Sequence, residues 1–184
     1  SLKAGRIYGI TGDNGMGKST FIRLIAGLCM PDSGNIYIDD IEIKKYNVEY
    51  LRKHIGYLLQ KPLLLRGKNP IDNIDTKRMM RYFNMGKKRY LEENVKGLSG
   101  GESQKLALAY LLSDKTKDIY ILDEPTASVD LKSEEVICSQ IRDALKGKTA
   151  LIITHRRSIL KICDEVIDFN KEVSYKNVRN SREM

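Results

Sequence analysis

The stretch GDNGMGKST at residues 12–20 decides the fold of this chain. It follows the apolar run Arg6–Ile10, which predicts a buried strand, and it leads into Lys18–Leu28, where apolar residues recur at helical spacing. A glycine-rich loop that joins a strand to a helix matches the pattern of a phosphate-binding loop. The first prediction is therefore a site for a phosphorylated ligand at the start of that helix.

Each part of this loop has a predicted chemical role. Gly15 and Gly17 let the backbone curl so that successive N–H groups face phosphate oxygens, and the helix start adds the positive end of its dipole. We expect Lys18 to bridge the β- and γ-phosphates, Ser19 to ligate Mg²⁺ and Thr20 to reach the α-phosphate. A bare glycine-rich turn is the alternative. The predicted nucleotide-binding residues of the loop are Asn14, Gly15, Met16, Gly17, Lys18, Ser19 and Thr20.

A second group of candidate residues follows the apolar run Ile119–Leu122, where Asp123 and Glu124 are adjacent. The carboxyl ends of parallel strands form the ligand crevice of such sheets. We expect Asp123 to hold the Mg²⁺ shell, mostly through water, and Glu124 to orient and deprotonate an attacking water. The alternative is an acid that caps a helix beginning after Pro125.

A second predicted anion site lies at Ser99-Gly100-Gly101, directly before the apolar helical stretch Leu106–Leu112. Small residues at a helix start expose N–H groups to an anion. One nucleotide cannot easily use both this site and the phosphate loop of the same subunit. The two sites together therefore predict a composite site shared between two molecules.

The fold class follows from the remaining apolar runs. Ile119–Leu122 and Ala150–Thr154 are continuous and of strand length, which is typical of central parallel strands covered on both faces. Strands that alternate with helices predict an α/β protein with a parallel sheet. A turn and the strand Asn35–Asp39 are expected after the first helix. From Gln60 to Leu98 the pattern is basic and irregular, and we interpret its cluster of Met79, Met80, Phe83 and Met85 as the core of a small helical subdomain.

Composition leaves the choice of anion open. The chain has 184 residues, with 32 Lys and Arg against 24 Asp and Glu, so its net charge is +8. This excess suits nucleic acid, a membrane surface or a phosphorylated small molecule. The basic clusters Lys44-Lys45, Lys87-Lys88-Arg89 and Arg156-Arg157 are scattered and lack interleaved aromatics, so we expect them to be solvated surface and expect no nucleic-acid partner.

Cysteine and histidine usage argues against a structural metal site. Cys29, Cys138 and Cys163 are widely spaced in apolar stretches, which predicts buried free thiols in a reducing compartment. His54 and His155 are the only histidines, and no group of Cys and His residues has the spacing of zinc ligands. We expect His54 to be structural or exposed.

Taken in order along the chain, these elements resemble the nucleotide-binding domain of an ATP-binding cassette (ABC) ATPase over nearly the whole sequence. The four-residue core of the signature motif is specific to that family, whereas the Walker A loop is shared by many nucleoside triphosphatases. The matching elements are Walker A at 12–20, Gln60, the signature Leu98–Glu102, Walker B with Asp123 and Glu124, Ser128-Val129-Asp130, and His155.

The resemblance implies a P-loop NTPase (RecA-like) fold and one domain over residues 1–184. Residues 1–60 and 114–184 would form the nucleotide-binding α/β core, and residues 61–113 a helical subdomain that carries the signature. Only eleven residues precede Gly12, so we expect the N-terminal antiparallel part to be truncated and the adenine-stacking aromatic to be missing; Tyr8 lies too close to the loop. Glu102 and Val129 replace a more usual glutamine and leucine.

The resemblance also implies a head-to-tail dimer with two ATP molecules at its interface, each held by Walker A of one subunit and by Ser99, Gly100 and Gly101 of the other. Gln60 corresponds to a lid glutamine that senses Mg²⁺, His155 to a switch histidine on the γ-phosphate and water, and Asp130 to a loop that communicates across the dimer. The expected catalytic residues are Lys18, Gln60, Glu124 and His155, and the expected metal residues are Ser19, Gln60 and Asp123.

The function implied by this family is ATP hydrolysis that powers transport across a membrane. The expected partners are a second nucleotide-binding domain and a transmembrane transporter domain, and the expected location is cytoplasmic, at the inner face of the membrane. The alternatives are a soluble ABC ATPase acting on chromosomes or ribosomes, and a module that binds ATP without hydrolysis, which Glu124 and His155 disfavour. The resemblance to the exporter branch rests on the order of Leu51-Arg52, Gln60, Pro62 and Asn73-Ile74.

Overall fold

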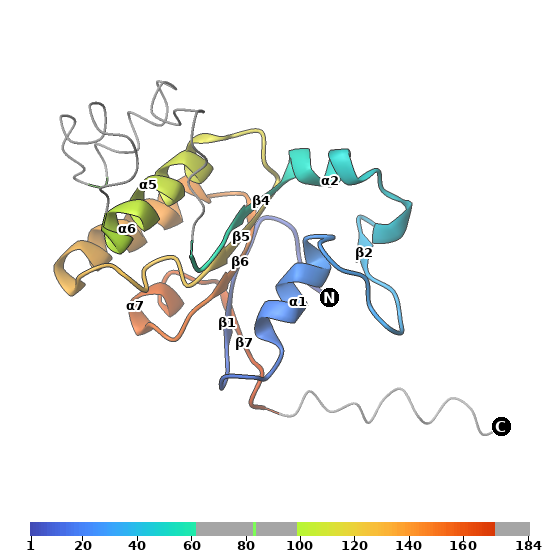
Figure 1. Cartoon of the computed structure of the whole chain (residues 1–184), viewed down its shortest axis with the longest axis horizontal. Coiled ribbons are helices and arrows are strands. Elements are labelled where there is room, and N and C mark those ends of the chain that lie inside the picture. The colour runs from blue at the N-terminus through green and yellow to red at the C-terminus, as the bar shows by residue number, and fades with distance from the viewer. Residues whose placement is uncertain (62–82, 84–98, 172–184) are drawn as a thin grey trace.

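A five-stranded parallel sheet forms the centre of the protein (Figure 1) in a computed structural model that describes residues 1–61, 83 and 99–171. The strand order is β4-β5-β6-β1-β7. The predicted strands at Arg6–Ile10, Ile119–Leu122 and Ala150–Thr154 are confirmed within one residue as the three inner strands. The strands are β4 (Ile55–Leu58), β5 (Ile119–Asp123), β6 (Thr149–Ile153), β1 (Ile7–Thr11) and β7 (Glu165–Asp168).

Two hydrophobic clusters cover the two faces of this sheet. Along β6, Ala150 and Ile152 belong to one cluster, whereas Leu151 and Ile153 belong to the other. Successive side chains of a strand point to opposite faces, so a strand buried on both faces needs apolar residues at every position. This double burial is the physical reason for the continuous apolar runs in the sequence.

The helices lie in two layers, one on each side of the sheet (Figure 1). One layer holds α1 (Lys18–Ile25), α2 (Val48–His54), the short helical turn Ile43–Lys45 and a two-stranded antiparallel sheet of β2 (Tyr37–Ile38) and β3 (Ile41–Glu42). The other layer holds α5 (Gly100–Ser113), α6 (Leu131–Ala144) and α7 (Arg157–Leu160). The predicted parallel α/β core is confirmed, together with a small antiparallel sheet.

Two predicted elements are shorter than expected. The strand predicted over Asn35–Asp39 contributes only Tyr37 and Ile38, because Asp39 and Asp40 adopt left-handed backbone angles that turn the chain (φ 48° and 62°). The first helix ends at Ile25, before Gly27, whose φ of 67° suits glycine best.

The helix α5 packs into the α/β core. Leu106, Leu108 and Leu112 are fully buried in the cluster that contains Tyr120 of β5. Of the segment assigned to a helical subdomain, residues 62–82 and 84–98 lie outside the described residues, including Met79, Met80, Met85, Leu98 and the Lys87–Arg89 cluster. Phe83 is buried in the same core as α5. The two-part division of the chain therefore stays a prediction.

The prediction of three buried thiols is wrong for Cys29. All three cysteines are free, but Cys29 is exposed, Cys163 is half-buried and only Cys138 is buried. The reason is that α1 ends at Ile25, so Cys29 lies in the loop beyond it instead of on the packed helix face. Burial raises the pKa of the Cys163 thiol to about 12.

His54 has the first of its two expected roles, a structural one. Its Nδ1 lies 2.6 Å from Oδ2 of Asp118, and its ring stacks on Tyr50 with 4.2 Å between centroids. The pair joins the end of α2 to the start of β5, and the His54 hydrogen bond lowers the pKa of Asp118. Within the described ranges, no helix is both long and apolar enough to cross a bilayer.

Candidate functional site

The glycine-rich loop carries the chain from the end of β1 to the start of α1. Gly15 and Gly17 have φ of 84° and 85°, a conformation that side chains strongly disfavour. Lys18 is only 7% exposed, because its Nζ folds back and donates to the carbonyl oxygens of Gly12 at 2.6 Å and Asp13 at 2.7 Å. These contacts hold the ammonium group against the backbone of the loop.

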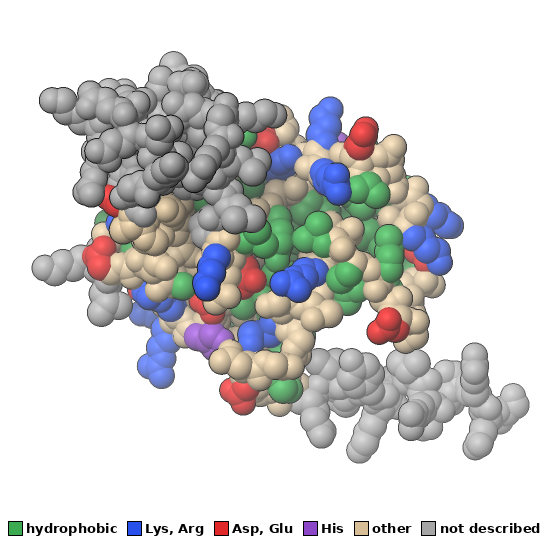
Figure 2. Space-filling view, in the orientation of Figure 1, with side chains coloured by type: hydrophobic (Ala, Val, Ile, Leu, Met, Phe, Trp, Pro, Cys, Tyr) green, Lys and Arg blue, Asp and Glu red, His purple; other side chains and the backbone are tan. Residues whose placement is uncertain are grey.

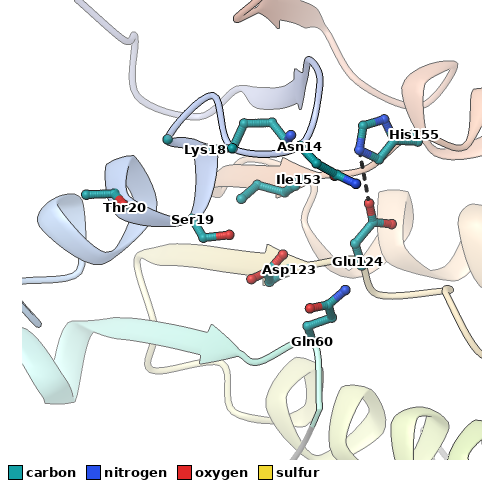
Figure 3. Close-up of a pocket in the computed structure, with 11 residues that line it drawn as sticks. Asn14, Lys18, Ser19, Thr20, Gln60, Asp123, Glu124, Ile153 and His155 are labelled. Atoms are coloured by element: carbon teal, nitrogen blue, oxygen red, sulfur yellow. Dashed lines mark ion pairs between the residues drawn. The ribbon is translucent and has the colours of Figure 1, made fainter.

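A cavity of about 280 Å³ opens beside this loop, and most of the predicted site residues line it (Figure 3). Met16 is not among the lining residues and is 47% exposed. Ile153 lines the cavity although the sequence analysis did not name it. The lining residues are Asn14, Gly15, Gly17, Lys18, Ser19, Thr20, Gln60, Asp123, Glu124, Ile153 and His155.

The topology of the sheet explains why residues so far apart in sequence meet here. The loop follows β1, Gln60 follows β4, Asp123 ends β5, and His155 follows β6. These four strands are parallel neighbours, so their carboxyl ends lie along one edge of the sheet. The site is therefore assembled at the edge that the sequence analysis predicted.

Three oxygen-bearing side chains of this cavity form a candidate metal site. Ser19 and Asp123 face each other, and Gln60 points toward the same space from below them in Figure 3. Burial raises the pKa of Asp123, while the charges of Arg23 and Lys18 oppose that shift. Hydroxyl, carboxylate and amide oxygens are ligands suited to a hard cation, and Mg²⁺ usually combines one or two carboxylates with phosphate and water. The donor set therefore fits Mg²⁺.

Glu124 and His155 face each other across the mouth of the cavity. His155 Nε2 lies 3.9 Å from Glu124 Oε1, and the buried Thr154 donates its hydroxyl to Glu124 Oε2 at 3.5 Å. Burial raises the pKa of Glu124, against the opposing charge of His155. A partly buried carboxylate with a raised pKa that lines the cavity can accept a proton from water.

The alternative role of Glu124 as a helix cap is wrong. The next helix, α6, begins at Leu131 and is capped by Asp130, whose Oδ1 accepts the Ser133 N–H at 2.9 Å. Glu124 instead has a left-handed backbone with φ of 49°, which is unusual for a residue with a side chain. Asp130 therefore caps α6, and its role in communication across a dimer, assigned by resemblance, stays a prediction.

The described signature residues, Ser99–Glu102, lie outside this cavity. Ser99 caps α5: its Oγ accepts the Glu102 N–H at 3.3 Å, and Glu102 Oε2 accepts the Ser99 N–H at 2.8 Å. Ser99 and Gly100 are exposed, and Gly101 is half-buried. The structure thus presents the start of α5 to solvent and leaves the composite site a prediction.

Two residues that hold the loop after β5 were missed, although neither of them lines the cavity. Gln104 of α5 is 1% exposed and binds the loop after β5 through both ends of its amide. A polar residue within an apolar helix, one turn after Gly101, is the signal that could have revealed it. Arg156 was assigned to solvated surface, and that is wrong: its guanidinium bonds to buried Glu134 at 2.5 Å and to the Ala127 carbonyl at 3.0 Å.

The other basic residues fit the surface prediction where they are described. Lys44 is exposed and pairs with Glu42 at 2.6 Å, and Arg157 is exposed. On the face drawn in Figure 2, the described Lys and Arg side chains are dispersed among acidic and hydrophobic ones. Such a distribution is typical of a solvated surface.

The fold and the site together define a nucleotide-binding ATPase domain of the phosphate-loop class. Comparison with known proteins gives the particular family: a family model described as ABC transporter matches residues 1–127, and the chain belongs to this family. The predicted resemblance is confirmed. The chain is therefore an ABC-type ATP-binding domain, a class of ATP hydrolases.

The curated relatives include a P-glycoprotein and a protein named for toxin translocation. P-glycoprotein 14 of Caenorhabditis elegans is 31% identical over 94% of this chain and 14% of that protein. The alpha-hemolysin translocation ATP-binding protein HlyB of Escherichia coli is 33% identical over 93% of this chain and 27% of that protein. The chain thus spans at most about a quarter of these relatives. They give no support to the alternative of a soluble ABC ATPase of chromosomes or ribosomes.

Solved structures agree with the family. The ATP-binding cassette MJ0796, in a dimeric post-hydrolysis state bound to ADP and Pi, superposes with a TM-score of 0.77 at 26% identity, covering 91% of this chain and 82% of that one. A second dimeric structure of MJ0796, described as a bacterial ABC transporter cassette, gives the same values.

Proposed function

We propose that this chain binds and hydrolyses ATP to power transport across a membrane, as a subunit or domain of an exporter-like ABC transporter. The observation that carries the proposal is the placement of Glu124 and His155, 3.9 Å apart, over the same cavity as Lys18 and Ser19. A phosphate-binding loop alone supports binding of a nucleotide. A base and an imidazole at the position of the terminal phosphate support its hydrolysis.

The residues divide by role. The loop residues 14–20 bind the phosphates, with Lys18 on the β- and γ-phosphates. Ser19, Asp123 and Gln60 would hold Mg²⁺, which when bound neutralises charge on the phosphate oxygens. Glu124 accepts a proton from the attacking water. At the same step the water oxygen bonds to the γ-phosphorus, and the bond between the γ-phosphorus and the ADP oxygen breaks. His155 orients that water and the γ-phosphate through Nε2.

A second nucleotide-binding domain is the proposed partner. Ser99 and Gly100 are exposed at the capped start of α5 and do not line the cavity, so the anion site they form is available to a nucleotide held by another subunit. Two such subunits, head to tail, would enclose two ATP molecules. The names of the relatives support a transmembrane transporter domain as the further partner, and hence a position at the inner face of a membrane.

The experiment is the Glu124→Gln variant, with ATP binding, ATP turnover and molecular mass in ATP measured on the same preparation. The amide keeps the size of the side chain but cannot accept the proton, so we expect ATP binding to persist, turnover to fall by about 10²-fold or more, and an ATP-bound dimer to accumulate. Glu135→Gln is the matched control, because Glu135 is exposed on α6 and outside the cavity. Unaltered turnover in Glu124→Gln would show that the catalytic assignment is wrong.

A further inference from the structure

The loop between β5 and α6, residues 124–130, is attached directly to the start of α5. Gln104 makes the attachment through its amide: Nε2 donates to the carbonyl oxygen of Glu124 at 2.5 Å, and Oε1 accepts the N–H of Ser128 at 3.0 Å. Gln104 is 1% exposed, so these bonds are shielded from water. Because both ends of the amide are used, the side chain fixes two points of the loop at once.

Other contacts on the same face of α5 hold the two segments together. A Cβ on Gly101 would lie 2.5 Å from the carbonyl oxygen of Ser128, so the helix backbone rests on the loop with no room for a side chain. Lys105 Nζ lies 3.9 Å from Oδ2 of Asp130. Gly101, Gln104 and Lys105 are spaced three and four residues apart, which places them on one face of the helix.

The opposite side of the loop is held by Arg156. Its guanidinium donates to the carbonyl oxygens of Ala127 at 3.0 Å and Val129 at 3.3 Å, and it is braced by Glu134 of α6. These bonds fix the later part of the loop. Gln104, by contrast, binds the backbone of Glu124 itself, at the residue whose φ of 49° turns its carboxylate to the cavity.

We propose that Gln104 is a positioning residue for ATP hydrolysis, which couples the orientation of the Glu124 carboxylate to the start of α5. The inference rests on the proposed function, in which Glu124 serves the nucleotide of its own subunit and Ser99, Gly100 and Gly101 serve that of the partner. A shift of α5 toward the partner's nucleotide then moves the Glu124 backbone with it. Each subunit thereby senses the neighbouring site through one side-chain amide.

Two substitutions separate the two bonds. Gln104→Glu keeps an oxygen that can accept the Ser128 N–H, but it replaces the donor to the Glu124 carbonyl with a second acceptor. Gln104→Met keeps the length of the side chain and removes both bonds. Tyr110→Met is the control for the same introduced residue, because Tyr110 is on α5 and 52% exposed.

The test measures ATPase kinetics and amide hydrogen exchange on the full chain. We expect kcat to fall in both variants by about 10²-fold, the effect of a ~1 Å misplacement of a catalytic group. We expect KM for ATP to change by less than about threefold, because Gln104 does not line the cavity and so contributes no uniform binding. The Ser128 amide should stay protected in Gln104→Glu and exchange faster in Gln104→Met, and Tyr110→Met should match the wild type in every measurement.

The outcomes distinguish the inference from the proposed function. If the wild-type chain hydrolyses no ATP, the proposed function fails and the inference fails with it. If the wild type hydrolyses ATP and both Gln104 variants keep its kcat, or lose activity through KM alone, only the inference is wrong. Should Gln104→Met fail to fold, the kcat and Ser128 protection of Gln104→Glu decide the matter, since that variant keeps one of the two bonds.

Discussion

The contact between Glu134 and Arg156 allows a quantitative prediction about stability. Glu134 lies on α6 and is 3% exposed, and its carboxylate accepts the Arg156 guanidinium at 2.5 Å and the Ser158 hydroxyl. Replacing Glu134 by alanine removes the anion and leaves the guanidinium beside the buried part of the loop without its counter-charge. We expect Glu134→Ala to be among the more destabilising single changes outside the hydrophobic core.

The magnitude follows from the burial of the two partners. Removing one member of a buried ion pair costs about 3–5 kcal/mol. The Arg156 side chain keeps 29% exposure and its bonds to two carbonyl oxygens, which places this pair at the lower end, near ~3 kcal/mol. For a domain of this size that loss corresponds to a fall in Tm of about 6–12 °C. Glu134→Gln keeps an acceptor for Ser158 and should lose about half as much free energy.

The assay is urea denaturation followed by circular dichroism, with the midpoint and the slope m fitted separately. The midpoint should fall while m stays constant, because the surface exposed on unfolding does not change. Glu135→Ala is the control: it removes a neighbouring carboxylate that is exposed, and its free energy of unfolding should stay within about 0.5 kcal/mol of the wild type. A loss below about 1 kcal/mol in Glu134→Ala would refute the view that the pair is buried and well satisfied.

Two further predictions concern ionisation. Burial raises the pKa of Glu124, so the ligand-free protein should hold the proton of this carboxyl to a higher pH than an ordinary glutamate does. Its ¹³C carboxyl resonance, assigned by its loss in Glu124→Gln, should therefore titrate above about 4.3, and a midpoint at or below about 4.3 contradicts the environment described. Since the base must be ionised, kcat/KM, which reports the free enzyme, should decline as the pH falls through that midpoint. Cys29 is exposed, whereas burial raises the pKa of Cys163 to about 12. A thiol reagent at neutral pH should therefore modify Cys29 first and Cys163 only after unfolding, which mass mapping would show. Equal modification rates for the two thiols would disprove this burial pattern.

Elements with a strong local pattern were predictable from sequence, and elements without one were not. The sequence predicts the phosphate loop and the inner strands β1, β5 and β6, because glycine spacing and burial on both faces restrict which residue types can occur there. The helix α6 was not predicted, although its buried Ile137, Cys138 and Ile141 recur at helical spacing. The strand β7, by contrast, is exposed or half-buried throughout, so burial imposes little pattern on it.

The same division holds within the candidate site. Lys18, Ser19, Asp123, Glu124 and His155 were predicted, and the structure brings them to one cavity. The contacts that hold them could not be read from the chain. Whether a glutamine or an arginine binds a carbonyl oxygen depends on which backbone atoms lie beside its side chain. Most hydrogen-bond partners of Gln104 and Arg156 are more than 20 residues away in the sequence.

The sequence by itself determined the chemistry of this protein: a loop that fits phosphate, oxygen donors that fit Mg²⁺, and a carboxylate and an imidazole suited to hydrolysis. In the phosphate loop and the Asp123-Glu124 pair these properties reside in residue types and short spacings, which exist before the chain folds, whereas Gln60 and His155 were assigned from the resemblance to the family. Only the tertiary structure decided how the side chains that carry this chemistry are positioned. The order of parallel strands aligns their carboxyl ends along one edge, the Gln104 amide ties α5 to Glu124, and the end of α1 leaves Cys29 in water. Each of these outcomes depends on long-range packing, in which distant segments supply one another's partners.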